Sequence, residues 1–163
     1  MCDKKLKQIA KYLIDNKLTA ATAESCTGGL LSSRFTDISG SSGFIKANFV
    51  TYANEAKAEY LNVSENILKN FGAVSEECAY AMAEGLHMCT GCDLAICTTG
   101  IAGPTGGTKE KPIGLMYIGV YFKDKVTVKK FQLPPFIPRK MMKFLFTQEA
   151  IEFTYKEILF KQV

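Results

Sequence analysis

Apolar residues recur at helical spacing near both ends of the chain. Leu6, Ile9, Ala10 and Leu13 would share one side of a helix over residues 4–17, which predicts an amphipathic helix. A second amphipathic helix is predicted to begin at Arg139, after a proline-rich break. The residues on its apolar face are Met142, Leu145, Phe146, Ala150 and Phe153.

Further helices are predicted between these two. The longest follows Ser75 as its N-cap and ends near Gly91. Its apolar stripe consists of Ala79, Met82, Ala83 and Leu86. Shorter helices are expected over residues 30–35, over residues 54–61 with Asn54 as N-cap, and after Ser64 as N-cap.

Runs of β-favouring residues separate these helices. Residues 19–24, 44–52 and 94–98 predict single strands, and residues 115–122 and 126–133 predict a β-hairpin. Because helices and strands alternate before the hairpin, we expect an α/β fold, a three-layer α/β/α sandwich on a mixed, mostly parallel sheet. The chain of 163 residues is 47% apolar, so we assign residues 1–163 to one domain.

The composition bears on the cellular compartment. No run approaches the roughly 20 apolar residues that span a bilayer, and no leader pattern precedes the first helix. We therefore expect a cytoplasmic protein with no membrane partner. Because cytosolic thiols stay reduced, the six cysteines are interpreted as buried apolar residues. Cys89 and Cys92 form a lone CxxC without a second pair of ligands, so we expect no metal ion.

Positive charge is concentrated late in the chain. The net charge is +4, and residues 123–143 hold seven Lys or Arg residues against the single acid Asp124. A nucleotide phosphate, an RNA backbone and a solvated face would each fit this asymmetry. We favour a small phosphate or a solvated face over nucleic acid.

Histidine chemistry is nearly excluded. His87 is the only histidine, and it falls within a predicted amphipathic helix, far in sequence from any nucleophile motif. A Ser-His-Asp or Cys-His arrangement would have to use it. We therefore predict that His87 packs on a helix or faces solvent, and that any nucleophile works with a different base.

Ser25 stands where a predicted strand gives way to a helix. The glycines that follow it, Gly28 and Gly29, allow a sharp turn that would present its hydroxyl at the edge of the sheet. The amides of Cys26, Thr27 and Gly28 would converge there on an oxyanion or a phosphate. The alternative is that Ser25 and Thr27 only cap the helix, and the local pattern does not separate the two.

Lys57 is the candidate base for Ser25. It falls in the first turn of a predicted helix, where the positive end of the helix dipole disfavours an ammonium ion and lowers its pKa. A cation is out of place there, which is sometimes a sign of function. A surface lysine that extends into water is the competing interpretation.

A glycine-rich loop follows the buried strand at residues 94–98, the position at which α/β sheets commonly bind ligands. We predict that its amides cradle substrate at Gly103, Gly106, Gly107 and Thr108. No Lys-Ser or Lys-Thr pair follows these glycines at the P-loop spacing, so ATP hydrolysis is not expected.

Arg139, at the start of the last helix, is a candidate phosphate ligand. The alternative is that it is an ordinary arginine at the rim of the site.

Several segments together resemble the CinA C-terminal domain family over roughly residues 5–155. They are AESCTGGLLSSRFTDISGSSGF, NFVTYANEAKAEYLNV, GAVSEE, TTGIAGPTGGTKEKPIGLMYIG and the C-terminal helix. The resemblance implies an amidohydrolase that converts nicotinamide mononucleotide to nicotinic acid mononucleotide and ammonia, without a metal or cofactor. Full-length members carry a separate N-terminal domain that this chain lacks, so activity of that domain is not expected.

The resemblance also implies roles for particular residues. It places the nucleophile at Ser25 and the catalytic lysine at Lys57, and it places Tyr52, Thr99 and Arg139 in the pocket. Tyr52 and Thr99 are the further candidate catalytic residues, and either could orient Lys57 or the carboxamide. One departure concerns the last of these. The family usually has Gly-Asp-Arg, whereas this chain has Ile137-Pro138-Arg139, with a further basic residue, Lys143, one turn later. Phosphate binding at this place is therefore expected to differ.

Two rival interpretations follow from the same residues. In the first, Cys26 is the nucleophile, because a helix N-terminus also stabilises a thiolate. In the second, the glycine-rich loop and the basic hairpin hold a nucleotide or nucleic acid without turnover, in line with the family's association with DNA uptake.

We also expect a homo-oligomer, in the simplest case a dimer.

Overall fold

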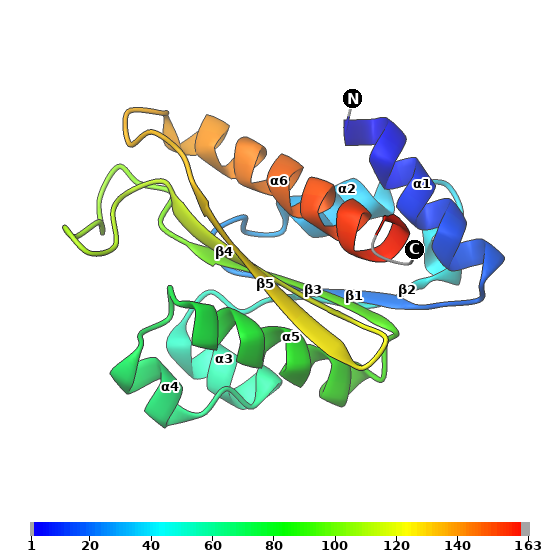
Figure 1. Ribbon diagram of the computed structural model, residues 1–163, viewed down its shortest axis with the longest axis horizontal. Coiled ribbons are helices and arrows are strands. Elements are labelled where there is room, and N and C mark those ends of the chain that lie inside the picture. The colour runs from blue at the N-terminus through cyan, green and yellow to red at the C-terminus, as the bar shows by residue number, and fades with distance from the viewer. Residues whose placement is uncertain (1, 161–163) are drawn as a thin grey trace.

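A five-stranded mixed sheet lies between two layers of helices in the computed structural model, which describes residues 2–160 (Figure 1). The strands are β1 (Ala20–Glu24), β2 (Ile45–Val50), β3 (Leu94–Gly100), β4 (Leu115–Phe122) and β5 (Lys125–Gln132). Their order is β2-β1-β3-β4-β5. β1 pairs in parallel with β2 and β3, and β4 is antiparallel to both its neighbours, so only β4 runs against the others. This confirms the predicted mixed, mostly parallel sheet.

The helices divide between the two faces of the sheet. Three of them, α1 (Cys2–Asp15), α2 (Leu30–Thr36) and α6 (Arg139–Leu159), cover the upper face in Figure 1. The lower face is covered by α3 (Asn54–Leu61), α4 (Glu65–Asn70) and α5 (Glu76–Thr90). A single 3-10 turn (Ser41–Gly43) precedes β2. The α/β/α sandwich predicted from the alternation of elements is therefore confirmed.

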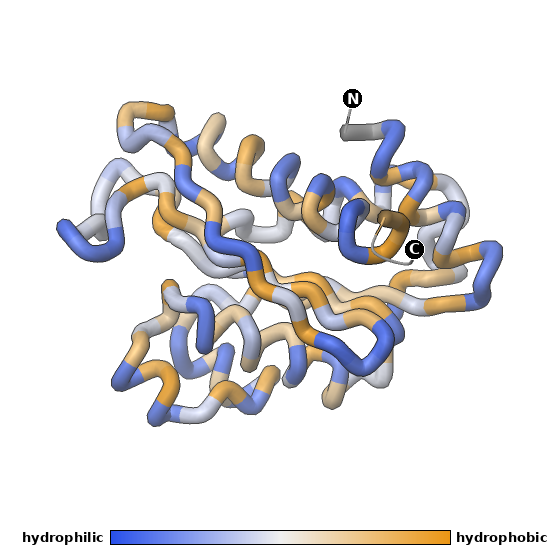
Figure 2. The backbone as a smooth tube through the Cα atoms, in the orientation of Figure 1, coloured by the Kyte–Doolittle hydropathy of each residue, from blue (hydrophilic) through white to orange (hydrophobic). Residues whose placement is uncertain are grey.

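Each face of the sheet buries its own apolar cluster, and Figure 2 shows hydrophobic stretches along the strands between the two helix layers. All residues of the predicted apolar stripes of α1 and α5 are buried. They are Leu6, Ile9, Ala10 and Leu13 in α1, and Ala79, Met82, Ala83 and Leu86 in α5. In α6, Met142 and Phe146 are buried. Leu145 is half-buried and lines a groove together with Phe131 of β5.

A close approach of backbones fixes α3 against α5. Gly85 of α5 lies so near α3 that an added Cβ would be 1.8 Å from the carbonyl oxygen of Leu61. Only glycine fits at this crossing. The position of α3, which carries Lys57, therefore depends on a residue of α5.

Most of the predicted turns and caps are confirmed. Ser64 accepts from the Ile67 amide and Ser75 from the Cys78 amide, and Gly91 ends α5 in the left-handed conformation. Lys123 and Asp124 both have positive φ angles, as a two-residue hairpin turn requires.

One predicted cap is wrong. The N-cap of α3 is Ala53 and not Asn54, because Ala53 has the extended backbone and its carbonyl accepts the first helical bond from the Lys57 amide. Asn54 is already helical, so its side chain does not cap the helix.

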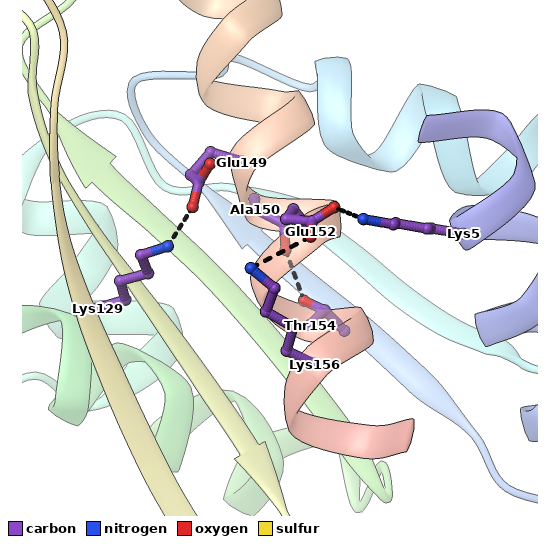
Figure 3. A network of polar contacts seen from close by, with 7 residues as sticks. All are labelled: Lys5, Lys129, Glu149, Ala150, Glu152, Thr154 and Lys156. Atoms are coloured by element: carbon purple, nitrogen blue, oxygen red, sulfur yellow. Dashed lines mark hydrogen bonds and ion pairs between the residues drawn. The ribbon is translucent and has the colours of Figure 1, made fainter. Parts of the chain in front are cut away.

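Ion pairs tie α6 to its neighbours (Figure 3). Lys129 of β5 pairs with Glu149, and Lys5 of α1 pairs with Glu152, which also pairs with Lys156 at 3.3 Å. Of the basic residues between positions 123 and 143, Lys129 is thus paired with a carboxylate of α6. Within residues 2–160, no helix combines the length and the apolar character that crossing a membrane requires.

The lone histidine has a packing role, as predicted. His87 Nδ1 lies 2.7 Å from the carbonyl oxygen of Cys92, and its ring stacks on Tyr121 with centroids 3.8 Å apart. The five cysteines whose side chains are described are free thiols, and Cys89 is exposed whereas Cys92 is buried.

Candidate active site

The carboxyl ends of the parallel strands meet at one edge of the sheet, and a cavity of about 270 Å³ opens there. Ser25 follows β1, Tyr52 follows β2, and Thr99 stands near the end of β3. The cavity is lined by Ser25, Cys26, Tyr52, Lys57, Ala73, Val74, Thr99, Gly100, Ile101, Ala102, Gly103, Thr105, Gly106 and Arg139. All four predicted catalytic residues therefore line the same cavity.

Ser25 and Lys57 are in contact within the cavity. Lys57 Nζ lies 3.3 Å from Ser25 Oγ, and it donates to the carbonyl oxygens of Thr51 at 2.7 Å and Tyr52 at 3.2 Å. Lys57 is only 1% exposed, and Ser25 is 9% exposed. The competing interpretation of Lys57 as a solvated surface lysine is therefore wrong.

The surroundings of Lys57 favour its neutral form. Burial lowers its pKa from the ordinary value of 10.5, because the ammonium ion loses its hydration. A neutral amine has two N–H donors and one lone pair. The two carbonyls take both donors, which leaves the lone pair to accept the proton of Ser25. A hydroxyl within reach of a neutral amine is the geometry that general-base activation of a serine requires.

The turn that carries Ser25 is held from both sides. The Ser25 amide donates to Thr98 of β3 at 3.0 Å, and the Gly28 amide donates back to the Ser25 carbonyl at 3.1 Å. Gly28 and Gly29 have φ angles of 60° and 92°, so the sharp turn uses their conformational freedom as predicted. Thr27 is buried, and its hydroxyl lies 2.7 Å from that of Thr98.

The amides at the start of α2 are bound to Glu24. This carboxylate accepts from the amides of Gly29 and Leu31 at 3.0 Å and from Ser32 at 2.7 Å. Neither Ser25 nor Thr27 therefore caps α2. Among residues 2–160, no oxygen accepts from the amides of Cys26 and Thr27.

Arg139 spans the mouth of the cavity. Its guanidinium donates to the carbonyl oxygen of Gly103 at 2.6 Å and to the hydroxyl of Tyr52 at 2.9 Å. Tyr52 is 60% exposed, so the pair forms the rim. Lys143 approaches the turn of Ser25 from the same helix: a Cβ built on Gly28 would lie 3.1 Å from its Nζ.

Some of the predicted binding residues lie outside the lining. Gly103 and Gly106 line the cavity, whereas Gly107 packs its backbone against Ile113 and Thr108 closes a turn with Lys111. Thr27 and Gly28 form bonds within the turn that carries Ser25. Thr99 lines the cavity and donates its hydroxyl to the Ala73 carbonyl at 2.7 Å. The substrate contacts assigned to these residues stay predictions.

The sequence reasoning missed Glu24 and the segment at Ala73 and Val74. Glu24 is 0% exposed at the end of a strand whose other residues are all buried. A carboxylate in such a run is itself a signal, because buried acids need several donors. Nothing in the local pattern around Ala73 indicates that it reaches the cavity.

The comparisons with known proteins agree on one family. The model of the CinA C-terminal domain matches residues 3–158. A CinA-like protein of Dictyoglomus thermophilum is 42% identical over 155 residues, which is 94% of this chain and 37% of that protein. A Clostridium tetani relative with a competence-damage inducible name is 46% identical over 93% of this chain and 36% of its own length. The chain thus spans about a third of the length of these curated relatives.

Solved structures show the same fold at full coverage. The structure of competence damage-inducible protein A (ComA) from Klebsiella pneumoniae superposes with a TM-score of 0.92 at 27% identity, over 99% of both chains. Competence/damage inducible protein CihA from Agrobacterium tumefaciens has a TM-score of 0.89 at 35% identity, over 93% of this chain and 92% of that one.

Proposed function

This chain belongs to the CinA C-terminal domain family, and from that premise we propose that it is an amidohydrolase that deamidates nicotinamide mononucleotide to nicotinic acid mononucleotide and ammonia. The observation that carries the proposal is the contact between Ser25 Oγ and the buried amine of Lys57. A hydroxyl beside an amine whose pKa is lowered by burial can be activated as a nucleophile when that amine is neutral. The substrate identity rests on the resemblance of the motifs.

The first half of the proposed reaction forms an acyl-enzyme. Lys57 takes the proton of Ser25 as Oγ attacks the carboxamide carbon, and the amides of Cys26 and Thr27 donate to the oxyanion. When the tetrahedral intermediate collapses, the carbon–nitrogen bond breaks. The protonated Lys57 gives its proton to the leaving nitrogen, which departs as ammonia.

The second half returns the enzyme to its starting state. Lys57, neutral again, takes a proton from water as the water oxygen attacks the acyl carbon. The ester bond to Ser25 breaks, and the proton on Lys57 returns to Oγ. The product is released as a carboxylic acid, which gives its proton to solvent and becomes a carboxylate.

The rim of the cavity fits the other end of the substrate. Arg139, Gly103 and Gly106 line the same cavity as Ser25. Arg139 uses two donors on Gly103 and Tyr52 and has further N–H groups for a phosphate oxygen. This supports a nucleotide whose amide lies inside the cavity and whose phosphate lies at the rim.

The rival thiol nucleophile is disfavoured. Burial raises the pKa of Cys26 to about 12, so its thiolate is scarce near neutral pH. Cys26 is 4% exposed and offers little surface to a substrate. We propose that its side chain only fills space beside the nucleophile.

The test is release of ammonia from nicotinamide mononucleotide by the purified chain. Turnover by the wild type, its loss in Ser25→Ala and its retention in Cys26→Ala would support the proposal. Absence of ammonia above the Ser25→Ala background from roughly pH 6 to 10 would contradict it and would favour a binding module or a different amide substrate. Loss in Cys26→Ala with retention in Ser25→Ala would reassign the nucleophile.

A further inference from the structure

Glu24 is a buried carboxylate next to the nucleophile, and it takes no part in the proton transfers described above. It is 0% exposed, and both of its oxygens are bonded. Oε2 accepts from the amides of Gly29 and Leu31, each at 3.0 Å. Oε1 accepts from the amide of Ser32 at 2.7 Å and from its hydroxyl at 2.5 Å.

These bonds replace an ordinary helix cap. The N-cap position of α2 is Gly29, which has no side chain to accept from the first amides. Glu24 reaches across from the last residue of β1 to do so. Because the first turn of a helix carries positive partial charge, an anionic acceptor is favourable there.

The bonds from the amides of Gly29, Leu31 and Ser32 to Glu24 form a clamp on the turn. This clamp encloses the residues to which the proposed function assigns the chemistry. Between Glu24 and Gly29 the chain consists only of Ser25, Cys26, Thr27 and Gly28. Its start is fixed to β3 by the bond from the Ser25 amide to Thr98. Its end is fixed to β1 by Glu24. A segment of four residues held at both ends has little freedom to move Oγ relative to Lys57.

The clamp also divides the amides of the turn into two groups. Those of Gly29, Leu31 and Ser32 are committed to Glu24, and that of Gly28 is committed to the Ser25 carbonyl. Those of Cys26 and Thr27 bond to no oxygen of residues 2–160. The oxyanion donors are therefore expected in the turn, immediately after the nucleophile, and not in α2.

We infer that Glu24 is a positioning residue for the deamidation: by binding the amides of α2 it fixes the turn that presents Ser25 and the amides of Cys26 and Thr27. This inference rests on the proposed function. A network extends the clamp into the sheet, since the Ser32 hydroxyl lies 2.7 Å from that of Thr22, which donates to Asn48 of β2 at 2.9 Å.

Glu24→Gln tests the inference, because an amide presents N–H groups where the carboxylate accepts. The turn should loosen, and kcat should fall by roughly 100-fold, the effect of misplacing a reacting group by about 1 Å. KM should change by less than roughly threefold, since the nucleotide contacts lie elsewhere in the cavity. An equal loss in KM and kcat, or wild-type kinetics, would overturn the inference.

A second readout is independent of the amide substrate. Diisopropyl fluorophosphate phosphorylates activated serines with loss of fluoride, so its rate of reaction measures the presentation of Ser25. Glu24→Gln should react at least roughly 30-fold more slowly than the wild type, because both the nucleophile and the oxyanion donors are displaced. If the wild type reacts but releases no ammonia, the proposed function fails while this comparison still decides the role of Glu24.

Two further variants separate positioning from folding. Ile9→Val removes a methyl from the buried stripe of α1 and should lower Tm without changing kcat. If Glu24→Gln does not fold, Glu24→Asp keeps the charge on a side chain one methylene shorter. It should show a lowered kcat with an unchanged KM. Wild-type kcat in Glu24→Asp would overturn the inference.

Discussion

Both protonation states of Lys57 can be paired with the three oxygens around its nitrogen. Two carbonyl oxygens and one hydroxyl oxygen lie within hydrogen-bonding distance of Nζ. An ammonium ion would donate to all three and leave Ser25 without a base. A neutral amine donates to the two carbonyls and accepts from Ser25. The lowered pKa of the buried Lys57 favours the second arrangement.

The pH dependence of deamidation should report this ionisation. Activity is expected to rise with pH as Lys57 loses its proton, and to level off above its pKa, which lies below 10.5. Lys57→Arg keeps the charge but does not lose its proton, so kcat should fall by roughly 100-fold or more while substrate still binds. Lys57→Met should be equally inactive. An arginine variant with near-normal kcat would show that the lysine acts only as a fixed charge.

Arg139 should act on affinity and not on chemistry. Arg139→Ala is expected to raise KM for nicotinamide mononucleotide much more than for nicotinamide riboside, because only the mononucleotide carries a phosphate. Tyr52→Phe is the matched control, since it removes the hydroxyl that Arg139 holds and leaves the guanidinium in place. Steady-state kinetics on both substrates give the comparison. Equal effects on the two substrates would remove Arg139 from the phosphate site.

At the scale of elements, the contact between α3 and α5 determines where Lys57 stands. Gly85→Ala would place a methyl group against the Leu61 carbonyl, so the two helices must separate. We expect the free energy of unfolding to fall by about 1–3 kcal/mol, the usual cost of overpacking. Activity should fall as well, because α3 moves away from Ser25.

Gly43→Ala is the control for this prediction. Gly43 has no atom within 4 Å of the position of an added Cβ, and its φ angle is not in the left-handed region. It should therefore keep the stability and activity of the wild type, as measured by denaturant titration and ammonia release. Unchanged stability in Gly85→Ala would contradict the close approach of the helices.

Elements that rest on local chemistry were predictable from the sequence. Ser64 and Ser75 cap their helices because their hydroxyls meet amides three residues later, and the stripe of α5 repeats every helical turn. Asn54 was assigned wrongly as a cap because Asn is a favoured N-cap, yet the chain turns one residue earlier. Local propensity does not determine the first residue of a helix to that accuracy.

Contacts between distant segments were not predictable in the same way. The motif around Lys57 indicated a base, but the contact of this lysine with Ser25 joins residues 32 positions apart, and its burial arises only in the folded chain. The bond between Arg139 and Tyr52 joins residues 87 positions apart. Glu24 binds the amides of α2 from five residues before the N-cap, whereas the glutamate of a capping box lies three residues after it.

For the whole molecule, the buried base carries a cost that depends on pH. In the unfolded chain Lys57 titrates near its ordinary pKa of 10.5, whereas in the folded protein its pKa is lower. Between these two pKa values the unfolded state binds more protons, so the stability contributed at this site increases as pH rises. Below the folded pKa both states are protonated, and the contribution no longer changes with pH.

Lys57→Met removes this ionisation and so isolates it. The free energy of unfolding of the wild type minus that of Lys57→Met should increase with pH, by at most about 1.4 kcal/mol per pH unit for a single proton. Urea titrations at several pH values below 10.5 measure the difference. The two unpaired carbonyls left by methionine lower its stability at every pH, and so do not affect the slope. A difference that stays constant or decreases over the whole range up to pH 10.5 would mean that folding does not lower the pKa of Lys57.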